Sequence, residues 1–138
     1  MTYVERCLYE YKANVASIEV MTEEIGELSS VHAQKYTAHS VNGVSDPVGD
    51  VTARILGLEA KIAKTERKVI PVEKLRDDLC GSELRYTQMK EVLELKYINH
   101  ESNHRTQELM AVSESTFRRR KRALLRMASE YFRAAHES

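Results

Sequence analysis

The sequence predicts an all-α fold in which two long N-terminal helices precede a C-terminal domain of shorter helices. Only two prolines and five glycines occur in 138 residues, so few positions break a helix. Apolar residues recur every three or four positions in two long segments, which is the helical period. Strand signals are few, since the one Asn42-Gly43 pair lies in a polar stretch without alternating apolar runs.

The first helix is expected over residues 2–29. Its apolar or neutral residues are spaced alternately by four and three, and Glu and Lys fill the other faces. This spacing gives one helical face a heptad stripe, which suits a coiled coil or a helix packed within its own domain. The stripe consists of Val4, Leu8, Tyr11, Val15, Ile18, Thr22 and Ile25.

Residues 30–46 are polar and aperiodic, which predicts a flexible loop. Ser45-Asp46-Pro47 then indicates a helix start, with proline in the first turn. The second long helix is expected over residues 47–70, and Pro71 is expected to interrupt it. Its stripe consists of Val48, Val51, Ile55, Leu58, Ile62, Thr65 and Val69. The two stripes could pair as an antiparallel hairpin or with a second copy, and we expect a homodimer.

A boundary between two domains is expected near residue 80. The short amphipathic stretch VEKLRDDL ends at Cys80, Gly81 suits the position after a helix, and Ser82 suits an N-cap. Residues 1–80 are therefore predicted to form a helical oligomerisation region, with its flexible loop at 30–46. Residues 81–138 are predicted to form the second domain.

The second domain is expected to contain three helices. The first runs from Glu83 to near Ile98, where the sequence NHESN breaks it. A short helix, HRTQELM, follows over residues 104–110, with Leu109 on its inner face. Ala111-Val112-Ser113 forms a turn, and Ser113 caps the last helix by accepting from the amide of Thr116. This last helix is expected from Glu114 to about Arg133.

The last helix separates into an apolar and a basic face at 100° per residue. The apolar face consists of Phe117, Leu124, Leu125, Ala128, Tyr131 and Phe132. The opposite face consists of Ser115, Arg119, Arg122, Arg126 and Arg133, with Arg118 at its margin. Lys121 falls on the apolar side, where its stem could lie along the core while its amine reaches solvent.

The charge distribution favours an anionic partner for the C-terminal part. Residues 84–138 hold 11 Lys/Arg and 7 Asp/Glu, whereas residues 1–83 hold 10 and 14. A short helix, a tight turn and a capped basic helix form a helix-turn-helix, whose second helix enters the major groove of duplex DNA. Arginine suits that role because it bonds guanine or phosphate bidentately. The candidate DNA-binding residues are Ser113, Ser115, Thr116, Arg118, Arg119, Arg120, Arg122, Arg126, His104 and Arg105.

Residues 89–128 resemble region 4 of bacterial sigma factors, and still more the related part of phage regulators. The matching features are EVLELKY on the first helix and TQELMAVSESTFRRRKRAL across the turn. The whole chain is similar to RinA/ArpU-type phage transcriptional regulators, which often carry a segment like Ser45-Asp46-Pro47. Two features depart from the pattern and bear on which promoter is read: Lys121 replaces a common leucine, and residues 104–109 lack the usual acidic pattern.

The resemblance implies an activator of phage late genes that binds promoter DNA in the cytoplasm of a bacterial host, at the nucleoid. It also implies host RNA polymerase as a further partner. Two other classes stay open: a small terminase subunit for DNA packaging, which joins a helix-turn-helix to an oligomerisation region, and a helical adaptor for an acidic protein. A ring-shaped oligomer would favour the terminase subunit. Binding that is insensitive to salt would favour the adaptor.

Other chemistry has little support in the sequence. No glycine-rich phosphate loop is present, His100 and His104 straddle a helix break without further metal ligands, and Ser113 with His104 lacks an orienting acid. We therefore expect no enzyme, no cofactor and no metal. Cys7 and Cys80 are expected to be reduced thiols, and neither a signal peptide nor a membrane span is expected. Four tyrosines could stack on single-stranded nucleic acid, but we expect them to pack on the helical stripes: Tyr3, Tyr9, Tyr11 and Tyr36.

Overall fold

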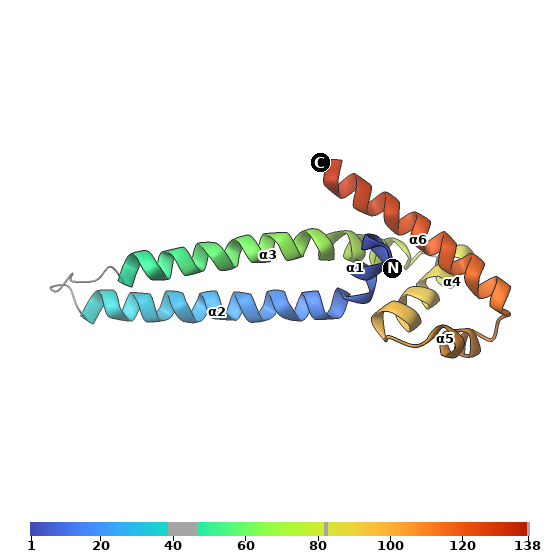
Figure 1. The fold of residues 1–138 in the computed structure, drawn as a ribbon, viewed down its shortest axis with the longest axis horizontal. Helices are drawn as coiled ribbons and strands as arrows, with labels where there is room; N and C mark the ends of the chain where they lie inside the picture. The colour runs from blue at the N-terminus through green and yellow to red at the C-terminus, as the bar shows by residue number, and fades with distance from the viewer. Residues whose placement is uncertain (39–46, 82, 138) are drawn as a thin grey trace. The chain divides into compact units, whose positions relative to one another are not determined.

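The computed structural model describes residues 1–38, 47–81 and 83–137. All regular structure in these ranges is helical, without a strand, so the all-α prediction is confirmed. The elements in chain order (Figure 1) are α1 (Tyr3–Tyr9), α2 (Tyr11–Ala38), α3 (Pro47–Asp78), α4 (Leu84–Val92), the π-helical η1 (Leu93–Ile98), α5 (Asn103–Met110) and α6 (Glu114–Glu137).

The chain divides into two compact units that differ from the predicted domains. Unit 1 comprises Met1–Asn14 and Arg67–Ser138, and unit 2 comprises Val15–Glu66. The boundary predicted at residue 80 therefore moves, because residues from both ends of the predicted oligomerisation region complete the core of unit 1. These are Cys7, Leu8, Val72, Leu75 and Leu79, all of which are buried in one cluster with residues of α4, η1 and α6.

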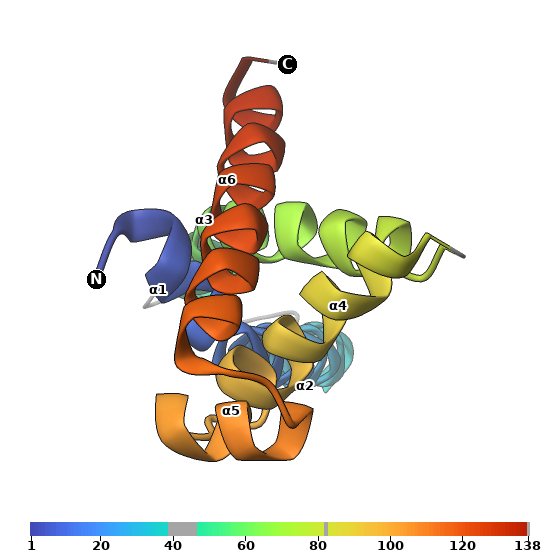
Figure 2. The same ribbon diagram turned by 90° about the vertical axis from the view of Figure 1, so that its right-hand side faces the viewer.

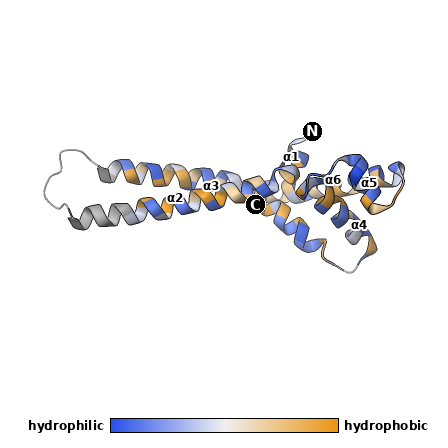
Figure 3. Ribbon diagram, turned by 90° about the horizontal axis from the view of Figure 1, so that it is seen from below, coloured by the Kyte–Doolittle hydropathy of each residue, from blue (hydrophilic) through white to orange (hydrophobic). Residues whose placement is uncertain are grey.

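Unit 2 is a helical hairpin, one of the two arrangements predicted for the stripes. Its parts of α2 and α3 lie side by side (Figure 1), and Arg54 Nη2 lies 3.8 Å from Glu24 Oε1 between them. Apolar positions recur along both helices (Figure 3). Thr22 is exposed and donates to the Ile18 carbonyl, so Met21 takes its place in the stripe. The half-buried apolar residues are Val15, Ile18, Met21, Ile25, Leu28, Val51, Ile55, Leu58 and Ile62.

The predicted loop starts too early. Helix α2 continues through Ala38, so residues 30–38 are helical rather than part of a loop, and the remaining residues 39–46 lie outside the described ranges. Ser45 and Asp46 belong to that gap, but α3 begins at Pro47, as the sequence predicted. Proline is tolerated in a first helical turn because its missing N–H would have no partner there.

The single N-terminal helix predicted over residues 2–29 is broken at Glu10. The Tyr9 carbonyl accepts a hydrogen bond from His100 Nε2 at 2.6 Å, and the His100 ring stacks on the Tyr9 ring with centroids 4.0 Å apart. Because that carbonyl accepts a hydrogen bond from a residue 91 positions away, a break in the helix is favoured at this point. Leu8 is consequently in the core of unit 1 and not on the hairpin stripe.

Pro71 does not interrupt the second long helix. It lies inside α3, which runs on to Asp78. Pro71 and Val72 are both buried, as are Leu75 and Leu79, so burial of this face offsets the hydrogen bond that proline cannot donate. The end predicted at Cys80 is also slightly displaced, because α3 ends at Asp78.

At the start of α4 the N-cap is Glu83, whose side chain makes no capping bond. Gly81 does not have a positive φ, so it is not a left-handed helix terminator. Ser82, the predicted cap, lies outside the described ranges.

The core of unit 1 is formed around α6. Helices α1 and α4 pack against α6, and α1 and α5 pack against η1 (Figure 2). Tyr97 of η1 is fully buried, and its hydroxyl donates to Glu5 Oε1 at 2.8 Å. The predicted helix from Glu83 to Ile98 is present, but its last part is π-helical. Asn99 N bonds to Glu94 O at 2.9 Å, which prolongs the five-residue hydrogen-bond spacing to the break.

Candidate nucleic-acid interface

A tight turn connects α5 to α6. Ala111 adopts the left-handed conformation, with φ 54° and ψ 46°, and its amide donates to the Glu108 carbonyl at 3.0 Å. The amide of Val112 donates to the Gln107 carbonyl at 3.3 Å, so the last turn of α5 is closed. Val112 also packs against the hydrophobic core. These contacts hold the direction in which α6 leaves the turn.

Ser113 caps α6 as predicted. Its Oγ accepts from the Thr116 amide at 3.2 Å. The same hydroxyl donates to Thr116 Oγ1 at 2.9 Å and lies 3.2 Å from Ser115 Oγ. The three predicted residues Ser113, Ser115 and Thr116 therefore form one hydroxyl network at the N-terminus of α6. Glu114 lies in the first helical turn, where a carboxylate is favourable.

The predicted apolar face of α6 is confirmed. Phe117, Leu124, Ala128 and Phe132 are buried, and Leu125 and Tyr131 are half-buried against the same core. The predicted polar face is exposed at Ser115, Arg118, Arg119, Arg122, Arg126 and Arg133. Burial of one face thus determines which arginines face solvent.

Most of these arginines have no acidic partner. Arg118 Nη2 pairs with Glu114 Oε1 at 2.5 Å. Within the described ranges, no ion pair or hydrogen bond of the side chain is present at Arg119, Arg120, Arg122, Arg126 and Arg133. By contrast, two arginines elsewhere in unit 1 have acidic partners: Arg76 pairs with Glu94 and Arg85 with Glu83. The unpaired guanidinium groups of α6 are available to an anion.

Lys121 is half-buried on the apolar side of α6, and its amine has an acidic neighbour that the sequence did not predict. Its Nζ lies 3.6 Å from Glu5 Oε1, the atom that also accepts from Tyr97. Burial is the main cause that lowers the pKa of Lys96, and the charge of the nearby Lys121 lowers it further. Burial, and then the bond to Glu5, raise the pKa of Tyr97. Glu5 lies far from α6 in the sequence, so no periodic pattern could identify it as the partner of Lys121.

The candidate residues on α5 are exposed but paired. His104 Nε2 lies 2.8 Å from Glu108 Oε1, and Arg105 Nη1 lies 3.2 Å from Glu108 Oε2. Leu109 is 46% exposed, so its prediction as the inner residue of α5 is wrong. Thr106 is the buried residue of α5, and its hydroxyl donates to the Ser102 carbonyl at 2.8 Å.

Two recesses flank α6. A recess of about 330 Å³ between α5 and α6 brings His104 together with Glu114 and Arg118. A groove of about 420 Å³ between α4 and α6 brings together Arg119, Arg120 and Arg126. Arg122 lies beside Arg118 on the outer face of α6. Arg105 lines neither recess. The basic run is therefore distributed over a face and its two flanks.

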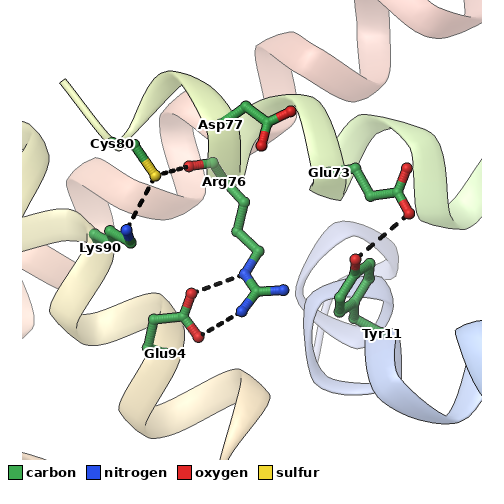
Figure 4. A pocket seen from close by; sticks show the side chains of 7 residues that line it. All are labelled: Tyr11, Glu73, Arg76, Asp77, Cys80, Lys90 and Glu94. Carbon is green, nitrogen blue, oxygen red and sulfur yellow. Dashed lines mark hydrogen bonds and ion pairs between the residues drawn. The ribbon is translucent and has the colours of Figure 1, made fainter.

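A third pocket, of about 220 Å³, lies away from this face (Figure 4). Arg76 donates to both carboxylate oxygens of Glu94, at 2.7 and 3.0 Å, and these bonds are the main cause that raises the pKa of Arg76. Lys90 Nζ lies 3.0 Å from Cys80 Sγ, and Tyr11 donates to Glu73 at 3.5 Å. These groups satisfy one another and connect α3 to α4, η1 and the start of α2.

The tyrosine prediction is corrected for three of the four rings. Tyr3 meets Phe132 edge to face at 6.1 Å, Tyr9 stacks on His100, and the Arg76 guanidinium lies 5.5 Å from the centre of the Tyr11 ring. These contacts place the three rings in unit 1 and not on the hairpin stripe. The side chain of Tyr36 lies outside the described set.

The remaining predictions concern metals, thiols and membranes. Among the described residues, no group of three or more His, Cys, Asp and Glu could hold a metal ion. Cys7 is buried and Cys80 is exposed, and both are free thiols. The helices in the described ranges include none with the length and apolar character needed to cross a membrane. No protein-family model, curated protein or solved structure matches the chain.

Proposed function

We propose that the chain is a transcriptional regulator of the RinA/ArpU type that binds a specific sequence of duplex DNA through α6. The observation that carries this proposal is the set of unpaired, exposed arginines on a helix that follows a tight turn and a serine cap. An arginine without an internal ion pair breaks no bond within the chain when it binds phosphate or guanine.

The N-terminal half of α6 is suited to the major groove. That groove is about 12 Å wide and accepts one α-helix. Ser115 is small and exposed, which permits a close approach to the bases. Arg118 and Arg119 lie in the same half and can reach base edges, whereas Arg122 and Arg126 lie further along and suit phosphates. His104 and Arg105 of α5 suit the adjacent backbone, as the first helix of such a motif crosses it.

We propose further that unit 2 joins two copies of the chain. One helix-turn-helix gains few base contacts, whereas a symmetric dimer reads two half-sites at a spacing of one helical turn or a multiple. The apolar stripe of the hairpin is only half-buried within one chain, which leaves surface for a second copy. Activation of phage late genes, with host RNA polymerase as a further partner, follows from the resemblance and is part of the proposal.

The test is binding of the full chain to fragments of the genome that encodes it, measured by fluorescence anisotropy at two salt concentrations. The double variant Arg119→Ala with Arg122→Ala is expected to lose specific binding while its helicity is kept. The slope of log K against log salt should fall by about 0.9 for each phosphate that the variant no longer neutralises. A reporter under the bound promoter then tests activation.

The matched control is Arg54→Ala with Lys61→Ala, which removes the same charge from exposed positions of unit 2. Arg54 makes only a long, exposed ion pair, so its loss affects stability little. Equal DNA affinity of the α6 variant and this control would reject α6 as the DNA-binding helix. Binding of the wild-type chain that does not change with salt would reject DNA as the partner.

A further inference from the structure

The groove between α4 and α6 has a composition that phosphate binding does not require. Tyr86, Met89, Ala123 and Met127 line it along its length. Met89 is buried, and Tyr86 and Met127 are half-buried against the core, so these side chains form an apolar floor. A phosphate group gains nothing from such a floor, whereas an apolar side chain does.

Arginines line the same groove. Arg119, Arg120 and Arg126 of α6 line the groove together with Arg85 of α4, and Glu130 is the acidic residue that lines it. The three arginines of α6 make no ion pair with the described residues, whereas Arg85 pairs with the exposed Glu83 and donates to the Tyr86 hydroxyl. An occupant must therefore be apolar on the side that faces the floor and acidic along its edges.

Shape and size favour a helix as that occupant. Helices α4 and α6 pack against each other (Figure 2). The groove that residues of both helices line has a volume of about 420 Å³. Recognition of an amphipathic helix in a groove uses apolar side chains one helical turn apart as anchors. Methionines suit such a surface because their flexible side chains adapt to the anchor.

We propose that this groove binds an acidic amphipathic helix of a partner protein. The apolar face of that helix contacts Tyr86, Met89 and Met127, and its carboxylates pair with Arg119, Arg120 and Arg126. Arg119 and Arg126 also belong to the exposed basic face of α6. If that face binds DNA, as proposed above, the partner helix and DNA compete for these two arginines, so that the partner controls promoter binding.

The experiment uses the full chain and a labelled synthetic peptide that forms a helix, with leucines on one face and glutamates beside that face. The same peptide with lysines in place of the glutamates is the control probe. The glutamate peptide is expected to bind, to bind at least about tenfold more tightly than the lysine peptide, and to be displaced by duplex DNA. Equal binding of the two peptides would overturn the proposal.

Two variants separate the groove from the DNA-binding face. Ala123→Phe fills the groove without changing charge, and is expected to weaken peptide binding at least about tenfold while DNA binding stays. Arg122→Ala, outside the groove, is expected to show the opposite result. If Ala123→Phe weakens DNA binding as much as Arg122→Ala does and the peptide fails to bind, the groove belongs to the DNA interface and the proposal is wrong.

A charge exchange keeps the test decisive if Ala123→Phe does not fold. Arg120 is half-buried in the groove, so Arg120→Glu is expected to reverse the preference between the two peptides. An unchanged preference would overturn the proposal. A chain that binds the glutamate peptide at the groove but no DNA would reject the DNA-binding function alone, because the peptide measurements do not depend on it.

Discussion

Unit 1 and unit 2 differ in how completely they bury their apolar side chains. In unit 1 the core residues Leu8, Leu75, Tyr97 and Leu124 are all essentially inaccessible to solvent. In unit 2, no described side chain is buried: the apolar residues between its two helices are only half-buried, and Val20 and Leu56 are 62% and 59% exposed. Both units are helical, so the difference lies in the number of helices that surround each apolar face.

The comparison shows which unit can be stable by itself. In unit 1, α1 and α4 pack against both α6 and η1, which gives its apolar residues a closed core. Two helices side by side cover only one line of contact, and the rest of each stripe stays near water. Helices draw most of their stability from packing of an amphipathic face, so a hairpin gains from a second layer. This is the physical basis on which we propose self-association through unit 2.

The largest expected effect concerns the half-buried stripes. Ile18→Asp with Ile55→Asp puts charges at the centre of both stripes, so the full chain should sediment as a monomer. If the proposed dimer binds DNA through both copies of α6, its loss should weaken operator binding about 10²–10⁴-fold, while non-specific binding changes little. The control is Ser17→Asp with Thr52→Asp, which adds the same charge at exposed positions. A monomeric variant that binds its operator as tightly as the wild type would refute self-association through unit 2.

The second prediction concerns the closed core of unit 1. Leu8→Ala should lower the free energy of unfolding by about 2–5 kcal/mol, because truncation of a fully buried leucine leaves a cavity. Leu56→Ala in unit 2 should change it by less than about 0.5 kcal/mol, since Leu56 is mostly exposed. Urea denaturation followed by circular dichroism measures both. Equal effects of the two variants would show that α1 is not part of the core.

A smaller effect is expected at the N-terminus of α6. Ser113→Ala should destabilise unit 1 by about 1 kcal/mol through loss of the cap to the Thr116 amide. Ser115→Ala serves as the control, because among the described residues the Ser115 hydroxyl has a hydrogen bond only with that of Ser113. Thermal melting compares the two variants. A melting temperature of Ser113→Ala that matches the control would mean that the cap does not stabilise the helix.

The smallest effect is expected for the bond from the Tyr131 hydroxyl to Asp78. Burial, and then that bond, raise the pKa of Tyr131 from 10.0 to about 12. The folded state therefore holds this proton more tightly than the unfolded state, so the contribution is complete below pH 10 and declines as pH rises toward about 12.

Tyr131→Phe should cost about 0.5 kcal/mol at neutral pH and weaken this alkaline decline. The comparison is made by urea denaturation across the pH range. Tyr9→Phe keeps the ring that stacks on His100 and is the matched control. An alkaline decline in Tyr131→Phe as steep as that of the control would show that Tyr131 contributes nothing to it.

The features that the local sequence predicted correctly each depend on residues that are close together in the chain. The two faces of α6, the cap at Ser113 and the stripes of the hairpin all depend on residues no more than a few turns apart. Helical geometry alone relates such residues, so their spacing is sufficient. The start of α3 at Pro47 belongs to the same class, since proline is tolerated in a first helical turn wherever the helix lies.

The features that the sequence did not predict depend on contacts between distant segments. The break at Glu10 depends on His100, the environment of Lys121 depends on Glu5, and the continuation of α3 through Pro71 depends on a buried face shared with α4 and α6. The sequence by itself determined that the fold is helical and which face of α6 is basic. Tertiary structure decided which helices belong to one core, because burial and long-range hydrogen bonds can outweigh local helix propensity by a few kcal/mol.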